Sequence, residues 1–145
     1  MSNPIDMQAA IIADLQQRLS GVELYGSEIS EGDVLSILDS EDAEQPPQQI
    51  VLQDGQTITL ETVPGSVREE FTVNVTLMDC GRHSANRLRS GRLAVKKALN
   101  PLVRGKKLPG ITEAAWLPEV VTRAGQGRSW ACRVMPMKFT YIQQL

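Results

Sequence analysis

The chain has few of the residues from which disulfide frameworks and metal sites are built. Its 145 residues include two cysteines, one histidine and 4% aromatic residues. Two cysteines cannot form the disulfide framework of a small secreted domain, so we expect free thiols, although one bridge between Cys80 and Cys132 stays open. The sequence also lacks the roughly 20-residue apolar run of a membrane span and the start of a secretory signal. We therefore expect a protein that is made and kept in the cytoplasm.

The composition is that of one globular domain. With 41% apolar and 22% charged residues, the chain is neither disordered nor fibrous. A chain of this length can bury roughly 70% of the surface that its unfolded form exposes. We expect a single domain over residues 1–145, with an aliphatic core because aromatic residues are few.

Acidic and basic residues are separated along the chain. Residues 1–70 contain 14 acidic and two basic side chains, whereas residues 71–145 contain 13 basic and three acidic ones. The two halves carry net charges of −12 and +10, although the whole chain carries only −2. A folded molecule with an acidic and a basic surface can attract polar partners, including copies of itself.

Two helices are expected from hydrophobic periodicity. Apolar residues at helical spacing predict an amphipathic helix over residues 4–19, with Asn3 as a cap and Pro4 in the first turn. A second helix is expected from 84 to 99, stopping near Pro101. Its apolar side is expected to lie on a sheet.

Strands are predicted from β-branched and alternating residues. The expected strands are 49–53, 57–63, 71–78, about 114–123 and 130–142. Asp54 and Gly55, between the first two, are typical of a tight hairpin turn. Pro136 cannot donate to a ladder, which indicates a sheet edge or a bulge. The order of elements predicts an α+β fold, with a mainly antiparallel sheet and two principal helices packed on one face.

An acidic segment separates the first helix from the strands. Residues 26–49 are poor in core-forming side chains, apart from a cluster at 34–38 that is expected to form a short helical turn, and Pro46 and Pro47 interrupt regular structure. We expect an acidic surface loop at 26–49 that orders against a partner. The acidic residues chosen as interface candidates are Asp33, Asp39, Glu41, Asp42 and Glu44.

Catalytic and metal-binding patterns are weak. Cys80, His83 and Cys132 supply three zinc ligands, but a closed structural site normally needs four. Cys80 and His83 also suggest a thiol nucleophile with a base in a small hydrolase, yet at this spacing they need not face each other. The glycine-rich stretches at 105–107 and 125–127 do not match phosphate loops. We therefore expect no enzyme, no cofactor and no metal.

A basic segment is the most specific feature of the second half. Nine basic residues from Arg82 to Lys107 have no acidic residue among them. Arg89, Arg92 and Lys96 form a stripe at helical spacing, and like charges so close are destabilising unless something anionic offsets them. The stripe fits a solvated helix face, an acidic protein partner or nucleic acid, the last opposed by a pI of 5.4 and few aromatic residues. The basic interface candidates are Arg87, Arg89, Arg92, Lys96 and Lys97.

The order of parts resembles the tail terminator proteins of tailed bacteriophages, in particular those of Mu-like contractile tails and more distantly the lambda type. The stretches that carry the resemblance are IDMQAAIIADLQQRL, QQIVLQDG, EEFTVNVTLMD, SANRLRSGRLAVKKALN and CRVMPMKFTYIQQ. The chain departs from the lambda type in its long acidic segment and in the hairpin expected around Asp54 and Gly55. The family offers no catalytic residue to carry over.

The resemblance implies a structural virion protein that forms a ring, hexameric in this family, on the end of the tail tube. Such a ring stops tube polymerisation and joins the tail to the head or neck. The implied partners are other copies of the chain and the tail tube protein, together with sheath and neck proteins, with DNA only in passage and no membrane. The implied location is the virion tail, after assembly in the host cytoplasm. The alternative is a small nucleic-acid-binding module that uses Arg82 to Lys107.

Overall fold

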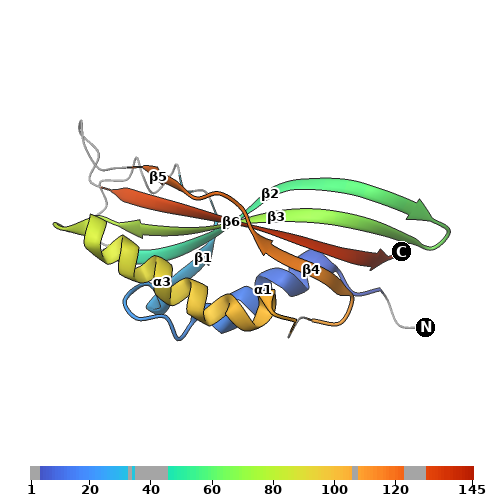
Figure 1. Cartoon of the computed structure of the whole chain (residues 1–145), viewed down its shortest axis with the longest axis horizontal. Helices are drawn as coiled ribbons and strands as arrows, with labels where there is room; N and C mark the ends of the chain where they lie inside the picture. The colour runs from blue at the N-terminus through green and yellow to red at the C-terminus, as the bar shows by residue number, and fades with distance from the viewer. Residues whose placement is uncertain (1–3, 33, 35–45, 106–107, 123–129) are drawn as a thin grey trace.

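The computed structural model describes residues 4–32, 34, 46–105, 108–122 and 130–145. Within these residues, two α-helices cover one face of a six-stranded sheet (Figure 1). The elements are α1 (Met7–Leu19), the 3-10 helix η1 (Tyr25–Ser27), β1 (Ile29–Glu31), β2 (Gln48–Val63), β3 (Ser66–Asp79), α3 (Ser84–Val103), β4 (Ile111–Trp116), β5 (Val120–Thr122) and β6 (Ala131–Gln144). The predicted α+β class, with both helices on one face, is confirmed.

The sheet is mainly antiparallel, as predicted. The strand order is β1-β2-β3-β6-β4, and β5 also pairs with β6. Only β1 and β2 run parallel among the described strands. β6 therefore holds β3 on one side and both β4 and β5 on the other.

The core lies between the helices and the sheet. The inner face predicted for residues 71–78 is confirmed, because Phe71, Val73, Val75 and Leu77 of β3 are fully buried. The prediction that only one face is buried is wrong for the second half of the strand, where Thr76 and Met78 are fully buried too. The inner face of β6 and the apolar stripes of the helices meet them; these residues are Met135, Met137, Phe139, Tyr141, Ile11, Leu15, Leu19, Leu88, Val95 and Leu99. A chain with few aromatic residues thus fills its core mainly with aliphatic side chains and methionine.

A smaller cluster covers one end of the opposite face of the sheet. Its buried members are Val34, Val51, Met78, Trp130 and Cys132. Cys80 is partly buried and packs against the same cluster, and Cys80 and Cys132 are not joined by a disulfide. Met78 is fully buried although it points away from the helices, because this second cluster covers it.

Both helices differ from prediction at their ends. α1 begins at Met7 because the Asp6 carboxylate caps it, accepting from the backbone N–H groups of Gln8 at 3.1 Å and Ala9 at 3.3 Å. α3 continues past Pro101 to Val103. Burial of Leu102 under the last turn offsets the hydrogen bond that proline cannot make.

The predicted turn at Asp54 and Gly55 is wrong. β2 continues through both residues to Val63 with a bulge beyond Asp54, and the turn lies at 64–65. Gly65 has φ +83°, which suits glycine. Glycine is needed at position 55 because the backbone of β3 lies very close: a Cβ on residue 55 would be 2.9 Å from the Thr72 carbonyl oxygen. The resulting long β2–β3 hairpin extends beyond the helices (Figure 1).

The acidic loop and the last strands also need correction. The loop predicted at 26–49 is wrong at both ends, because Ile29–Glu31 is a strand and β2 begins at Gln48. The helical turn expected at 34–38 lies, apart from Val34, outside the described residues. The strand expected at about 114–123 is two strands, β4 and β5, and residues 123–129 lie outside the described part.

Pro136 lies in β6, which is not an edge strand. Its carbonyl oxygen accepts from the Leu117 N–H at 2.9 Å, so this side of the residue faces the break between β4 and β5. β6 as a whole lies inside the sheet, but it has a local edge at Pro136, as predicted, because its pairing with β4 ends at Met137 and its pairing with β5 ends at Val134. The missing N–H is tolerated because the ladder of the neighbouring strands is interrupted at that point.

Candidate assembly surfaces

Arg87 is partly exposed and is paired with a buried carboxylate. Asp79 is fully buried at the end of β3 and accepts two hydrogen bonds from the Arg87 guanidinium, each at 2.8 Å. The Tyr25 hydroxyl donates to it at 2.9 Å and the Gly81 N–H at 2.8 Å. Burial alone would raise the pKa of Asp79, but the bonds from Arg87, Gly81 and Tyr25 lower it below its ordinary value. This group ties η1, β3 and α3 together.

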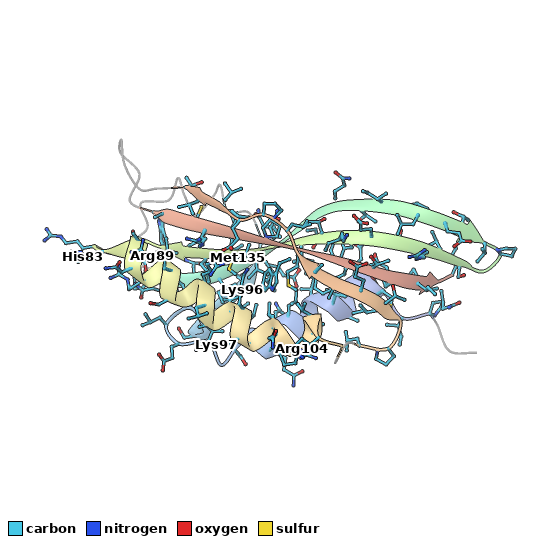
Figure 2. The ribbon with its side chains drawn as sticks, in the orientation of Figure 1. His83, Arg89, Lys96, Lys97, Arg104 and Met135 are labelled. Carbon is cyan, nitrogen blue, oxygen red and sulfur yellow. The ribbon has the colours of Figure 1, made fainter. Side chains whose placement is uncertain are left out.

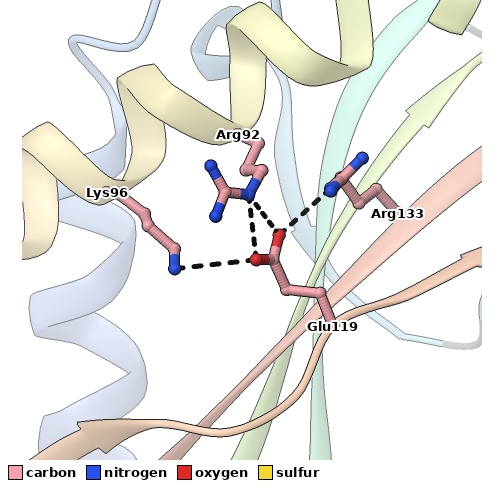
Figure 3. Close-up of polar contacts among 4 residues, drawn as sticks. All are labelled: Arg92, Lys96, Glu119 and Arg133. Atoms are coloured by element: carbon pink, nitrogen blue, oxygen red, sulfur yellow. Dashed lines mark hydrogen bonds and ion pairs between the residues drawn. The ribbon is translucent and has the colours of Figure 1, made fainter.

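Arg92 and Lys96 share a second carboxylate, that of Glu119 (Figure 3). Arg92 Nε donates to both oxygens of Glu119 at 2.7 and 2.8 Å, and Arg133 Nε of β6 donates at 3.0 Å. Lys96 Nζ lies 3.6 Å from Oε2 of Glu119 and 5.2 Å from the centroid of the Trp116 ring. Burial opposes ionisation of Glu119, but the bonds from Arg133 and Arg92 lower its pKa overall. The anion that the predicted stripe required is thus supplied by the chain itself.

The remaining basic candidates lie on the outward face of α3. Arg89 and Lys97 are exposed, and Leu93, half exposed, lies between them at a spacing of four residues. Arg104 is exposed farther along the same helix (Figure 2). Arg89 donates to the side chain of Asn86, and none of these three cations forms an ion pair with a described residue. The outward row, defined as Arg89, Leu93 and Lys97, is an apolar side chain between two unpaired cations.

An acidic groove lies on the other side of the molecule, between α1, β1 and β2. It has a volume of about 270 Å³ and is lined in part by Asp6, Ala9, Ile12, Ala13, Glu31 and Asp54. Glu31 and Asp54 are exposed and make no ion pair with a described residue. Sequence reasoning missed this acidic groove, as it missed Leu93 and Glu119. The three carboxylates stand far apart in the sequence, and only the fold joins them.

The predicted acidic interface residues lie outside the described part of the chain. These residues are Asp33, Asp39, Glu41, Asp42 and Glu44. Described acidic residues in the same half of the sequence nevertheless form the acidic groove. Charge separation along the sequence is therefore also a separation in space, with the acidic groove at the β1–β2 side and the outward row on α3.

The thiol and imidazole noted in the sequence lie in different surroundings, since Cys80 is partly buried and His83 is exposed. His83 is exposed, with φ 60°, at the start of α3 and lies at one end of the molecule (Figure 2). Burial raises the pKa of the Cys80 thiol, whereas an attacking cysteine needs a lowered one. Across the described ranges, no group of three or more His, Cys, Asp or Glu side chains is placed to hold a metal ion.

Comparisons with known proteins leave the family open. No family model and no curated protein matches the chain. No helix among the described residues combines the length and apolar character that crossing a membrane requires.

Proposed function

We propose that the chain is a structural subunit that assembles head to tail into a ring, and that this ring caps the tail tube of a phage virion. The observation that carries the proposal is the placement of unpaired charge. Acidic side chains line a groove beside β1, at one edge of the sheet, and basic side chains with no ion-pair partner among the described residues lie on α3, which is tied to the segment between β4 and β5 at the other edge. Two different complementary surfaces on one subunit produce a ring when the rotation closes.

The tail-terminator part of the proposal is supported by the order of elements, including the helix, the long strands and the second, arginine-rich helix. In that role the ring would end tube polymerisation and join the tube to the neck. Its partners would be other copies of the chain and the tube protein, with DNA passing through the ring. Its location would be the virion tail.

Sedimentation velocity at low and moderate salt tests ring formation, both alone and with polymerising tail tube protein. We expect a closed oligomer that weakens as salt rises, because exposed charges are screened beyond about 10 Å at 0.1 M salt. We also expect shorter tubes when the chain is present during polymerisation. A chain that stays monomeric and leaves tube length unchanged would rule out the proposal.

Nucleic-acid binding is the second candidate, favoured by the unpaired cations that follow one another on α3. Three of the nine basic residues from Arg82 to Lys107 are already paired with Asp79 or Glu119, which lowers the charge available to phosphates. This alternative predicts binding to DNA or RNA at low salt that falls steeply as salt rises. Absence of binding in an electrophoretic shift assay at low salt would exclude it.

A further inference from the structure

We infer that the acidic groove of one copy receives the outward row of α3 from the next copy. This inference rests on the proposed function, because it names the contact by which the ring closes. The two surfaces match in three ways: in charge, in apolar content and in position on the fold.

Charge is the first match. The outward row presents Arg89 and Lys97 two helical turns apart, and neither has an ion-pair partner among the described residues. The acidic groove presents Glu31 and Asp54, which are unpaired in the same sense. Bringing these surfaces together pairs opposite charges, whereas a slipped contact would bring like charges together.

Apolar contact is the second match. Leu93 is 50% exposed on the helix face between the two cations. The acidic groove has small, apolar residues along α1, where Ala9 and Ala13 are exposed beside the buried Ile12. A leucine between two cations thus meets alanines beside carboxylates. Central apolar anchors with a charged rim are typical of specific interfaces.

Position is the third match. The acidic groove adjoins β1, the last strand at one edge of the sheet. α3 is fixed to the segment between β4 and β5 through Arg92, Lys96 and Glu119, at the other edge. In a head-to-tail contact, a dimer uses the groove of one copy and the row of the other, so one groove and one row remain uncovered. Both are covered only when further copies close a ring.

Cysteine cross-linking tests the contact in the assembled full-length chain. The double variant Ala13→Cys with Leu93→Cys is oxidised under air with a copper catalyst and run on a non-reducing gel. We expect a ladder of linked multimers, because each copy can bond to two neighbours. Each single variant should give no ladder, and a mixture of the two should stop at dimers.

Charge exchange tests the same contact without new bonds. Arg89→Glu with Lys97→Glu should weaken self-association at least about tenfold, and adding Glu31→Lys with Asp54→Lys to the same chain should restore it. Arg68→Glu with Arg82→Glu, an equal charge change at two exposed cations outside the outward row, is the matched control. Chains that assemble but give no ladder and no rescue would overturn this contact alone. Absence of any assembly would overturn it together with the proposed function.

Discussion

Replacing Glu119 with glutamine should destabilise the fold, because this one carboxylate forms ion pairs with three cations. The substitution keeps the size of the side chain and removes its charge. Three hydrogen bonds of 2.7 to 3.0 Å from Arg92 and Arg133 end on Glu119, whose side chain is 16% exposed. Because the cations are partly exposed and two of the bonds share one donor, we expect a loss of about 3 kcal/mol in the free energy of unfolding.

Glu113→Gln is the matched control. It removes the same charge from the same half of the chain, but Glu113 is 55% exposed and lies 3.8 Å from its partner Lys138. We expect a loss of about 0.5 kcal/mol there. In thermal unfolding followed by circular dichroism, the two losses correspond to about 6–12 °C and about 1–2 °C for a domain of this size. Equal shifts in Tm would refute the assignment of Glu119 as the anion that holds the basic helix.

The stability difference between the wild type and Glu119→Gln should depend on pH. The pKa of Glu119 is lowered in the folded state, so its contribution is complete above the unfolded pKa of about 4.3 and is lost as pH falls through the lower folded value. The stability difference between the wild type and Glu119→Gln should therefore be full at pH 7 and shrink below about pH 4. A stability difference that stays constant from pH 7 to pH 3 would show that the negative charge of Glu119 does not stabilise the fold.

Two further predictions concern the packing around Tyr25. Asp79→Asn should lower the free energy of unfolding in urea by about 3 kcal/mol, whereas Tyr25→Phe, which removes one of four hydrogen bonds, should cost about 1 kcal/mol; equal losses would contradict the central role of Asp79. Gly91→Ala should cost about 1–3 kcal/mol in thermal unfolding, because its Cβ would lie 2.6 Å from the Tyr25 ring. Gly21→Ala, with nothing within 4 Å of its Cβ, is the control.

Hydrophobic periodicity was sufficient to find α1, β3, α3 and the inner face of β6. Each of these buries one stripe of side chains, and a stripe depends only on spacing within the element. The position of the hairpin turn was not accessible in this way. Both Asp54–Gly55 and Pro64–Gly65 are turn sequences, and the choice depends on the pairing of Thr57 with Phe71 in the neighbouring strand.

Of the candidate surfaces, only the part formed by residues close together in the sequence could be predicted. The basic stripe on α3 was visible because its members are close in sequence, and like charges at that spacing require an anion. The identity of that anion was not visible, because Glu119 stands 27 residues from Arg92. The acidic groove was missed for the same reason, since Asp6, Glu31 and Asp54 come from three elements.

The central place of β6 in the sheet constrains how the chain folds. β3, β4 and β5 all precede β6 in the sequence, yet each of them pairs with β6. Met78, for example, pairs with Cys132 across the whole of α3. Such distant pairing has a high loop-closure cost and slows folding. The edge strands β4 and β5 must therefore wait for the last element in the chain before they find a partner.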